Sequence, residues 1–399
     1  MERKKQKRLM NLFQAAALVT AALCTASSCT GNRSAGQGVS ANTETVHVKK
    51  EGSITELENQ DYQMKIEAHL ELDEEKTLFS CSRMKYDAGY YFLAETGRNQ
   101  TILVFDSLGN YVSKLGDKGR KESEYETEIT DWFYIPDAGK VLVYEGQKSM
   151  LHVFAIGGDY VKTIRFSQLY PDAIGAIAYD KIYCLCQRKA GEDGDAAQLC
   201  TVSDNGEIIE SLISLEDDMA FVPHKRCFHS YQNRLYHIPS YADSAIVFNR
   251  NSVEKVVRFT FDDDFLTEKE KAEACAGQIE SYFHFKGIQS IVAYYETSRF
   301  HYLVYVDSGT YWHHLIDKEN GKQYRFNTDM TKGLFPGSAL CVRDNKLLYY
   351  VSKEKIDEMR QIIDPDAYEK LLAKSHETIQ RIFRGDEQLP LILSIEIKE

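Results

Sequence analysis

The sequence predicts an all-β fold, a six-bladed β-propeller with helical insertions in the late blades and an N-terminal strand that closes the ring. Three observations predict it. A unit of short apolar strands and tight turns recurs along the chain, and its turn positions Gly109, Gly158, Gly206 and Asn251 follow at roughly 45 to 50 residues, the interval of four-stranded blades. Strands such as 141–144 and 303–306 are apolar at successive positions, as expected when neighbouring sheets cover both faces. Prolines number only 7, which fits a chain of paired strands.

The repeated unit is clearest in the first two thirds of the chain. Turns rich in Gly, Asn and Asp connect its strands, and such turns are strong hairpin signals. The fifth unit ends in a strand over 322–326, after the turn that contains Gly321. The first four units are predicted to hold strands at 89–94, 101–105 and 111–115; at 132–135, 140–144, 150–155 and 160–166; at 176–179, 181–186, 198–203 and 207–215; and at 228–231, 234–239, 245–249 and 253–261.

Two helical insertions interrupt the late units. Thr267 and Glu270 have the spacing of a capping box, which predicts a helix to about residue 283 and explains why the spacing jumps before Gly321. The sixth unit begins with strands at 339–343 and 346–351, detours through helices in which Asp364 is an N-cap and Pro365 the first helical residue, and ends in a strand at 391–397. Strand 64–72 has no partner nearby in sequence, so we expect it to form the outer strand of this last blade and to close the ring.

The N-terminus predicts a lipoprotein signal peptide over residues 1–28. A basic start of eight residues precedes an apolar stretch from Leu9 to Leu23, which is too short and too rich in alanine to stay as a membrane span. The stretch closes with Ala-Ser-Ser before Cys29, which resembles a lipobox, and Cys29 is the predicted lipidation site. Cys24 is the competing candidate, but it follows the bulky Leu23. Ordinary secretory cleavage is the other alternative, since Ala26 stands where lipoboxes most often carry leucine.

Composition divides the mature chain into a flexible tether over 29–61 and a propeller over 62–399. The tether is poor in large apolar residues and rich in small polar ones. A net charge of -12 argues against nucleic acid as a partner, because phosphate recognition needs clustered Lys and Arg. Seven cysteines remain after lipidation of Cys29, an odd number, and we expect most of them to be small buried apolar residues.

Several phrases of the sequence resemble a known family. They are the lipobox, the segments 66–72 and 102–111, the ending 389–393, and the stretch 114–119 followed by Glu124-Tyr125. Together they are similar to the six-bladed β-propeller lipoproteins of Bacteroidota, and the likeness covers nearly the whole mature chain. Residues 121–123 are Lys-Glu-Ser where that family usually has Gly-Pro-Gly, so the conformation of this loop is open. The resemblance implies the fold and an envelope location, and it implies no catalytic residue.

Motifs of catalysis and metal binding are missing from the sequence. It contains no nucleophile elbow, zinc-protease motif, P-loop or EF-hand spacing, and it predicts no catalytic residue, no cofactor and no metal site. His313 and His314 are adjacent on a strand and face opposite sides, which does not suit a shared metal. Acidic clusters at 192–195, 216–218 and 262–264 could bind calcium, but solvated loop charge explains them better.

Two groups of residues are candidates for ligand binding. His224, Arg226 and His229 lie on the segment that enters the fourth unit and could line the mouth of a central channel, although a plain polar loop is the simpler interpretation. The aromatic segments 282–285 and 294–295 could stack on sugar rings, with packing between blades as the alternative.

The sequence leaves two hypotheses for function. The leading one is a non-catalytic binding or scaffold module for a small ligand, glycan or protein partner, held at the membrane by the lipid on Cys29. The alternative is a hydrolase or lyase whose carboxylates and histidines converge from different blades. Residues 30–33 lack an acidic cluster that would resemble a surface-export signal, so we expect an outer-membrane lipoprotein that faces the periplasm.

Overall fold

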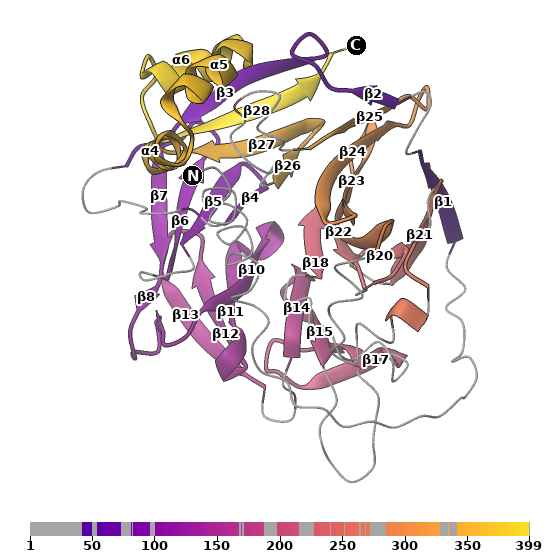
Figure 1. Ribbon diagram of the computed structural model, residues 1–399. Helices are drawn as coiled ribbons and strands as arrows, with labels where there is room; N and C mark the ends of the chain where they lie inside the picture. The colour runs from indigo at the N-terminus through magenta and orange to yellow at the C-terminus, as the bar shows by residue number, and fades with distance from the viewer. Residues whose placement is uncertain are drawn as a thin grey trace.

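The fold is a six-bladed β-propeller, described here from a computed structural model (Figure 1). The all-β class and the six-bladed ring predicted from the sequence are confirmed. Among the described residues, no helix is both long enough and apolar enough to cross a membrane. The structure describes residues 42–49, 54–72, 81, 83–95, 100–166, 169, 171–186, 198–214, 227–239, 241–250, 252–262, 265–267, 269–271, 285–327, 334 and 341–398.

Each blade is an antiparallel sheet whose strands follow one another from the centre of the ring to its rim. Blade 1 contains β4 (Arg83–Asp87), β5 (Tyr90–Glu95), β6 (Thr101–Asp106) and β7 (Tyr111–Leu115); blade 2 contains β10 (Ile129–Ile135), β11 (Lys140–Glu145), β12 (Met150–Ala155) and β13 (Tyr160–Arg165). Blade 3 contains β14 (Pro171–Ala178), β15 (Lys181–Cys186), β16 (Gln198–Val202) and β17 (Ile208–Ser214); blade 4 contains β18 (Phe228–Tyr231), β19 (Arg234–His237), β20 (Ser244–Phe248) and β21 (Val253–Phe261). Blade 5 contains β22 (Ile288–Glu296), β23 (Phe300–Asp307), β24 (Thr310–Asp317) and β25 (Gln323–Phe326).

Blade 6 is assembled from both ends of the chain. It contains β26 (Cys341–Arg343), β27 (Lys346–Val351) and β28 (Leu391–Ile397), and its outer strand is β3 (Tyr62–His69). β3 pairs antiparallel with β28 from Tyr62 opposite Ile397 to His69 opposite Leu391. The predicted closure of the ring by an early strand is therefore present.

Two further strands lie in the segment that the sequence predicted to be a flexible tether. β1 (Asn42–Val48) adds parallel to the rim strand β21 of blade 4, and β2 (Ile54–Glu56) adds parallel to the rim strand β25 of blade 5. Val46 and Val48 are buried by this pairing. The predicted flexible tether over 29–61 is wrong for residues 42–48 and 54–56, which are strands, whereas residues 29–41 lie outside the described residues. Alternate apolar residues in a polar segment gave β1 one face to bury, and composition averaged over the segment hid that pattern.

The turn glycines that define the repeat lie between neighbouring blades. A Cβ on Gly109 would lie 2.1 Å from the carbonyl oxygen of His69 in β3, and one on Gly206 would lie 2.9 Å from that of Arg165 in β13. Gly158 approaches the backbone of Lys114 in β7 in the same way, at 3.0 Å. All three glycines have positive φ. In blades 1 to 3, therefore, a glycine in the turn before the outer strand lets that turn pack on the rim strand of the preceding blade.

The loop after blade 1 is closed by its Glu-Tyr pair. Its two short strands β8 (Asp117–Lys118) and β9 (Glu124–Tyr125) are parallel. The Glu124 carboxylate accepts hydrogen bonds from the backbone of Arg120 at 2.8 Å and Lys121 at 3.0 Å, and the buried Tyr125 hydroxyl donates to Leu115 O at 2.9 Å. The conformation of this loop was not predicted from the sequence. Glu124 fixes it at the start of the Lys-Glu-Ser segment, at Lys121.

The late insertions are helical where the structure describes them. Thr267 and Glu270 form the predicted reciprocal capping box, while residues 272–284 lie outside the described residues. After β27 come α4 (Lys353–Ile362), α5 (Pro365–Lys374) and α6 (Glu377–Arg384), which pack beside β3 and β28 (Figure 1). Asp364 caps α5 as predicted. A separate helix, α6, follows α5 because His376 caps it directly after Ser375.

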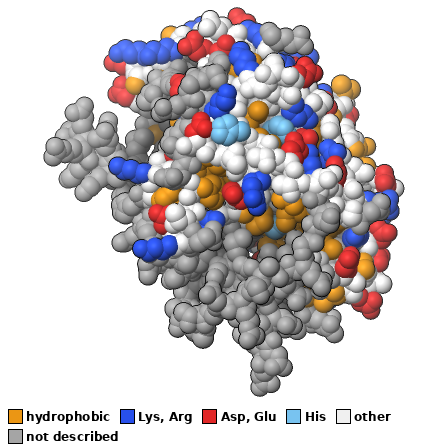
Figure 2. Space-filling model, turned by 90° about the vertical axis from the view of Figure 1, so that its right-hand side faces the viewer, with side chains coloured by type: hydrophobic (Ala, Val, Ile, Leu, Met, Phe, Trp, Pro, Cys, Tyr) orange, Lys and Arg blue, Asp and Glu red, His pale blue; other side chains and the backbone are white. Residues whose placement is uncertain are grey.

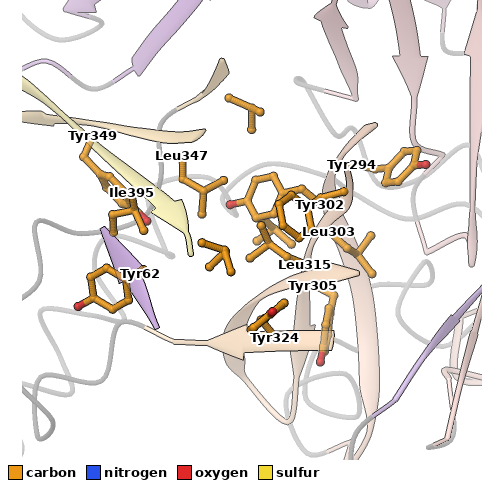
Figure 3. Packing of buried hydrophobic residues seen from close by; sticks show 14 of the residues in the cluster. Tyr62, Tyr294, Tyr302, Leu303, Tyr305, Leu315, Tyr324, Leu347, Tyr349 and Ile395 are labelled. Carbon is orange, nitrogen blue, oxygen red and sulfur yellow. The ribbon is translucent and has the colours of Figure 1, made fainter. Parts of the chain in front are cut away.

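The core lies between the blades, and its largest fully buried side chains are aromatic. Figure 3 shows Tyr62 from β3 near Ile395 from β28, with Leu303 and Leu315 of blade 5 across the gap. Six cysteines are free thiols in the described part of the chain, and five of them are buried, as expected for small core residues. Cys275 lies outside the described residues.

Blade 5 also buries adjacent histidines on opposite faces of β24. The His313 ring forms a hydrogen bond of 2.6 Å with the Tyr302 hydroxyl and stacks on Phe326. The His314 ring forms one of 2.8 Å with the Gln323 side chain. The predicted opposition of the two side chains is therefore seen. Burial lowers the pKa of each ring, and that of the buried His237, to about 4.

Gly109→Ala should destabilise the protein by about 2 kcal/mol or more, because a positive φ and a backbone clash with β3 add together. Gly139→Ala is the matched control: φ is also positive, but nothing lies within 4 Å of the new Cβ, and the cost should be about 1 kcal/mol. Chemical denaturation measures both. Equal losses would contradict the packing role of Gly109.

The free energy of unfolding should fall as the pH drops from 6.5 to about 4. The pKa values of His237, His313 and His314 are lowered in the folded protein. In this window the unfolded chain therefore binds protons on these three rings, and the folded chain does not. Each ring contributes about 1.4 kcal/mol per pH unit. His313→Phe should reduce the slope by about that amount. Stability that is flat from pH 7 to 5 would refute this account.

Candidate functional site

The candidate site is a cavity of about 360 Å³ at the centre of the ring. Inner strands of five blades form its wall, together with one residue of β5. This volume lies near the lower end of the range of about 300 to 1,000 Å³ that small-molecule pockets occupy. The lining residues are Arg83, Met84, Lys85, Tyr86, Asp87, Phe92, Trp132, Tyr134, Phe228, His229, Ser230, Val292, Ala293, Tyr295, Cys341 and Val342.

A buried carboxylate beside the cavity holds two cations of β4 in place. Asp131, 1% exposed, accepts hydrogen bonds from the Arg83 guanidinium and from Lys85 Nζ at 2.7 Å. The backbone amide of Trp132 donates to the same oxygen at 2.8 Å. Burial raises the pKa of Asp131, but the charges of Arg83 and then Lys85 outweigh it and hold this pKa below its usual value. Asp131 is thus an ionised anchor for the two cations.

Both cations also lie against aromatic rings. The Arg83 guanidinium is 4.4 Å from the centre of the Trp132 ring, and Lys85 Nζ is 3.9 Å from that of Phe133. Their side chains remain 12% and 21% exposed. A partly exposed cation fixed by a carboxylate and a ring face is pre-organised to meet an anion.

Two polar atoms on the wall of the cavity have no hydrogen-bond partner in the described part of the chain. They are Trp132 Nε1 and His229 Nε2, and both are buried. The other ring nitrogen of His229 pairs with the Tyr295 hydroxyl at 3.3 Å. Burial, and then the charge of Lys85, lower the pKa of His229 to about 4, so this ring is neutral at pH 7. Orphaned buried polar groups cost free energy, so these two atoms are candidates for a contact with a ligand.

Asp87 is the second carboxylate of the site. It ends β4, on the same face of the strand as Arg83 and Lys85. Burial raises the pKa of Asp87 to about 6, against the opposing charge of Lys85. A carboxyl with this pKa in a cleft is able to exchange a proton near neutral pH.

The structure brings only part of the predicted site together. His229 lies in β18 and lines the cavity, whereas His224 and Arg226 lie outside the described residues. Tyr295, from the aromatic segment at 294–295, also lines the cavity, while Tyr294 is packed in the core. No group of three or more His, Cys, Asp or Glu in the described ranges could hold a metal ion.

The residues that give the cavity its charge were not identified from the sequence. Arg83, Lys85 and Asp87 belong to a strand that was missed altogether, and Asp131 precedes a strand that was predicted to begin at Trp132. The alternation Arg-x-Lys-x-Asp directly before an apolar hairpin was the available signal: it predicts a strand with one charged face.

The rim offers a weaker alternative to the central cavity. A groove of about 90 Å³ lies between the segment after β2, β25 and the turn between α5 and α6, where Arg325 stacks on Trp312 at 4.6 Å. Rim charges of both signs are interspersed, as Figure 2 shows, and Lys255 pairs there with Glu44 at 2.6 Å and Glu296 at 2.7 Å. The rim groove has about a quarter of the volume of the central cavity.

Comparisons with known proteins identify the family and support the fold. The solved structure of a Bacteroides fragilis protein described as a candidate exported protein is similar, with 10% identity, a TM-score of 0.70, and coverage of 89% of this chain and all of the other. A Bacteroides vulgatus protein of the DUF4221 family is 11% identical with a TM-score of 0.46, covering 86% of this chain and all of the other. None of the curated proteins compared with the chain matches it. The model of one family, described as domain of unknown function DUF4934, matches residues 50–381. Because that match spans most of the sequence, the chain belongs to the DUF4934 family.

Proposed function

We propose that this protein is a lipid-anchored envelope protein whose propeller binds a small ligand in its central cavity without transforming it. The observation that carries the proposal is the cavity wall, where Trp132 Nε1 and His229 Nε2 are buried without partners beside two pre-organised cations. A wall built for stability alone would be apolar, because desolvation offsets the attraction between buried charges. The propeller supplies the rigid frame, since its inner strands fix the side chains on five blades.

Binding explains the carboxylates of the site better than catalysis does. General acid-base chemistry on a glycan or small molecule needs two groups with different proton affinities at the reacting atoms. Asp131 is committed to Arg83 and Lys85, and its lowered pKa makes it a poor base. Among the described lining residues that leaves Asp87 as the proton-exchanging carboxyl.

The second candidate function, a hydrolase or lyase, depends on Asp87. Its pKa of about 6 suits a general acid or base near neutral pH. This function would require Asp87 to act with the neutral His229 or with a residue outside the described ranges. The two candidates differ in one observable, because a binding protein returns its ligand unchanged.

Ligand binding can be measured through Trp132, because the chain has only two tryptophans. In the Trp312→Phe variant, Trp132 is the sole reporter and lines the cavity. We expect saturable quenching or a spectral shift with at least one member of a panel of sugars, sugar acids, amino acids and aromatic acids. The Trp132→Phe variant, which reports from the rim groove through Trp312, should not respond to the same compound.

Two outcomes would overturn the binding proposal. A Trp132 signal that no compound changes would mean that the cavity is structural. Mass spectrometry of the bound compound after incubation tests catalysis: conversion that Asp87→Asn abolishes would replace binding by the enzymatic function. Recovery of the compound unchanged supports binding.

The lipid anchor requires its own test. The proposal that Cys29 carries it depends on the signal-like N-terminus and on the absence of large apolar residues directly after it. When the full chain is expressed in a Bacteroides host, the protein should fractionate with the outer membrane, and Cys29→Ser should release it or block its processing. Cys24→Ser is the matched control and should remain anchored. If Cys24→Ser is released and Cys29→Ser is not, the assigned position is wrong.

A further inference from the structure

The central cavity has the chemistry of a receptor for one carboxylated sugar. We propose that it takes a single hexuronic-acid-like ring, with the carboxylate at Arg83 and Lys85 and the hydroxyls toward the far end of the cavity. The inference depends on the proposed binding function and names its ligand class.

The carboxylate is placed by the cationic end of the cavity. Arg83 donates to Asp131 and to Thr130 O, which accounts for two of the five N–H donors of a guanidinium. Its plane is fixed over Trp132, and 12% of its side chain stays exposed. Planar carboxylates match this donor geometry.

The hydroxyls are placed by the remaining polar groups. Asp87 lies four residues beyond Arg83 on β4, about 13 Å at the rise of a strand, so the cavity has a cationic end and a carboxylate end. Trp132 Nε1 can donate to a ligand oxygen, and the unpartnered His229 Nε2 adds a second polar contact on the wall. A ligand that carries only a carboxylate and an apolar ring would leave these groups unsatisfied.

The ring is indicated by the walls and the volume. Tyr86, Tyr134 and Tyr295 line the cavity with aromatic surface, which suits the apolar face of a sugar. A cavity of about 360 Å³ accommodates one ring and excludes a long oligosaccharide. A free monosaccharide acid and the end of a short glycan share this chemistry.

Isothermal titration of the full mature chain tests the inference with D-glucuronate, D-galacturonate, D-glucose and benzoate. At least one uronate should bind about tenfold or more tightly than glucose, because a charge-assisted hydrogen bond contributes that much. Benzoate should bind more weakly than the uronate, since it cannot reach Asp87 or His229. A disaccharide that ends in the same uronate is also titrated. Its binding would indicate the end of a short glycan as the ligand, and binding of the free uronate alone would indicate a monosaccharide acid.

Paired substitutions keep the buried charges balanced. Removing Arg83 alone would leave Asp131 buried with one cation, so the test variant is Arg83→Gln/Asp131→Asn. It should lower uronate affinity about tenfold and leave glucose affinity unchanged. The matched control is Arg234→Gln/Glu254→Gln, which removes a paired Arg and Glu that do not line the cavity, and it should change neither affinity.

The outcomes separate this inference from the proposed function. Equal binding of glucose and uronates, or tight binding of benzoate alone, overturns the carboxylated sugar and leaves small-ligand binding intact. If the Trp132 reporter responds to other compounds but not to the uronates, glucose or benzoate, the carboxylated sugar is likewise overturned and small-ligand binding stays intact. Silence of Trp132 toward every compound overturns both.

Discussion

The pairing of β3 with β28 is the constraint on which the rest of the molecule depends. It joins the two ends of the propeller along the whole length of both strands, from Tyr62 opposite Ile397 to His69 opposite Leu391. An open array of six blades would leave the first and last sheets with exposed apolar faces and would not fix the inner strands around one axis. The turn of Gly109 then packs on His69, so blade 1 is seated on the closing strand itself. The same strand, β3, therefore both closes the ring and forms the contact between blade 6 and blade 1.

The central cavity is a consequence of that closure. Inner strands of five blades carry side chains to the cavity at the axis, and apolar residues alone could fill the space. Here β4 brings Arg83 and Lys85 to the axis, and β10 supplies Asp131 to neutralise one of them. Buried ion pairs of this kind contribute little to stability relative to apolar packing, because desolvation offsets the attraction between the charges. Their presence at the axis is the basis of the proposal that the cavity binds a ligand.

The frame was predictable from the sequence, and the site was predictable only in part. Turn glycines such as Gly109 and Gly158 reveal the repeat because each is required by an inter-blade contact, and apolar strands reveal the blades because both of their faces are covered. The strand β4 was missed because its Arg-Met-Lys-Tyr-Asp sequence carries charge on the face that the ring buries. The sequence around β4 does not indicate that this charged strand lies inside the ring. Asp131, the partner of Arg83, is nearly fifty residues away and belongs to another blade. His229 was found because it stands at a blade entrance, a position that topology alone assigns to the axis.

The rim strands β1 and β2 shorten the flexible segment that would link a lipid on Cys29 to the propeller. If the proposed anchor is correct, only residues 30–41 separate it from β1, and these twelve residues span at most about 40 Å. β1 runs parallel to β21, so it begins beside the turn between β20 and β21 and ends toward the connection from β21 to blade 5. The short outer turns, including those of Gly109 and Gly158, lie on the face where β1 begins, because successive blades repeat the same strand directions. A chain that leads from Cys29 would therefore join the propeller beside that face, and the connections between blades lie on the opposite face.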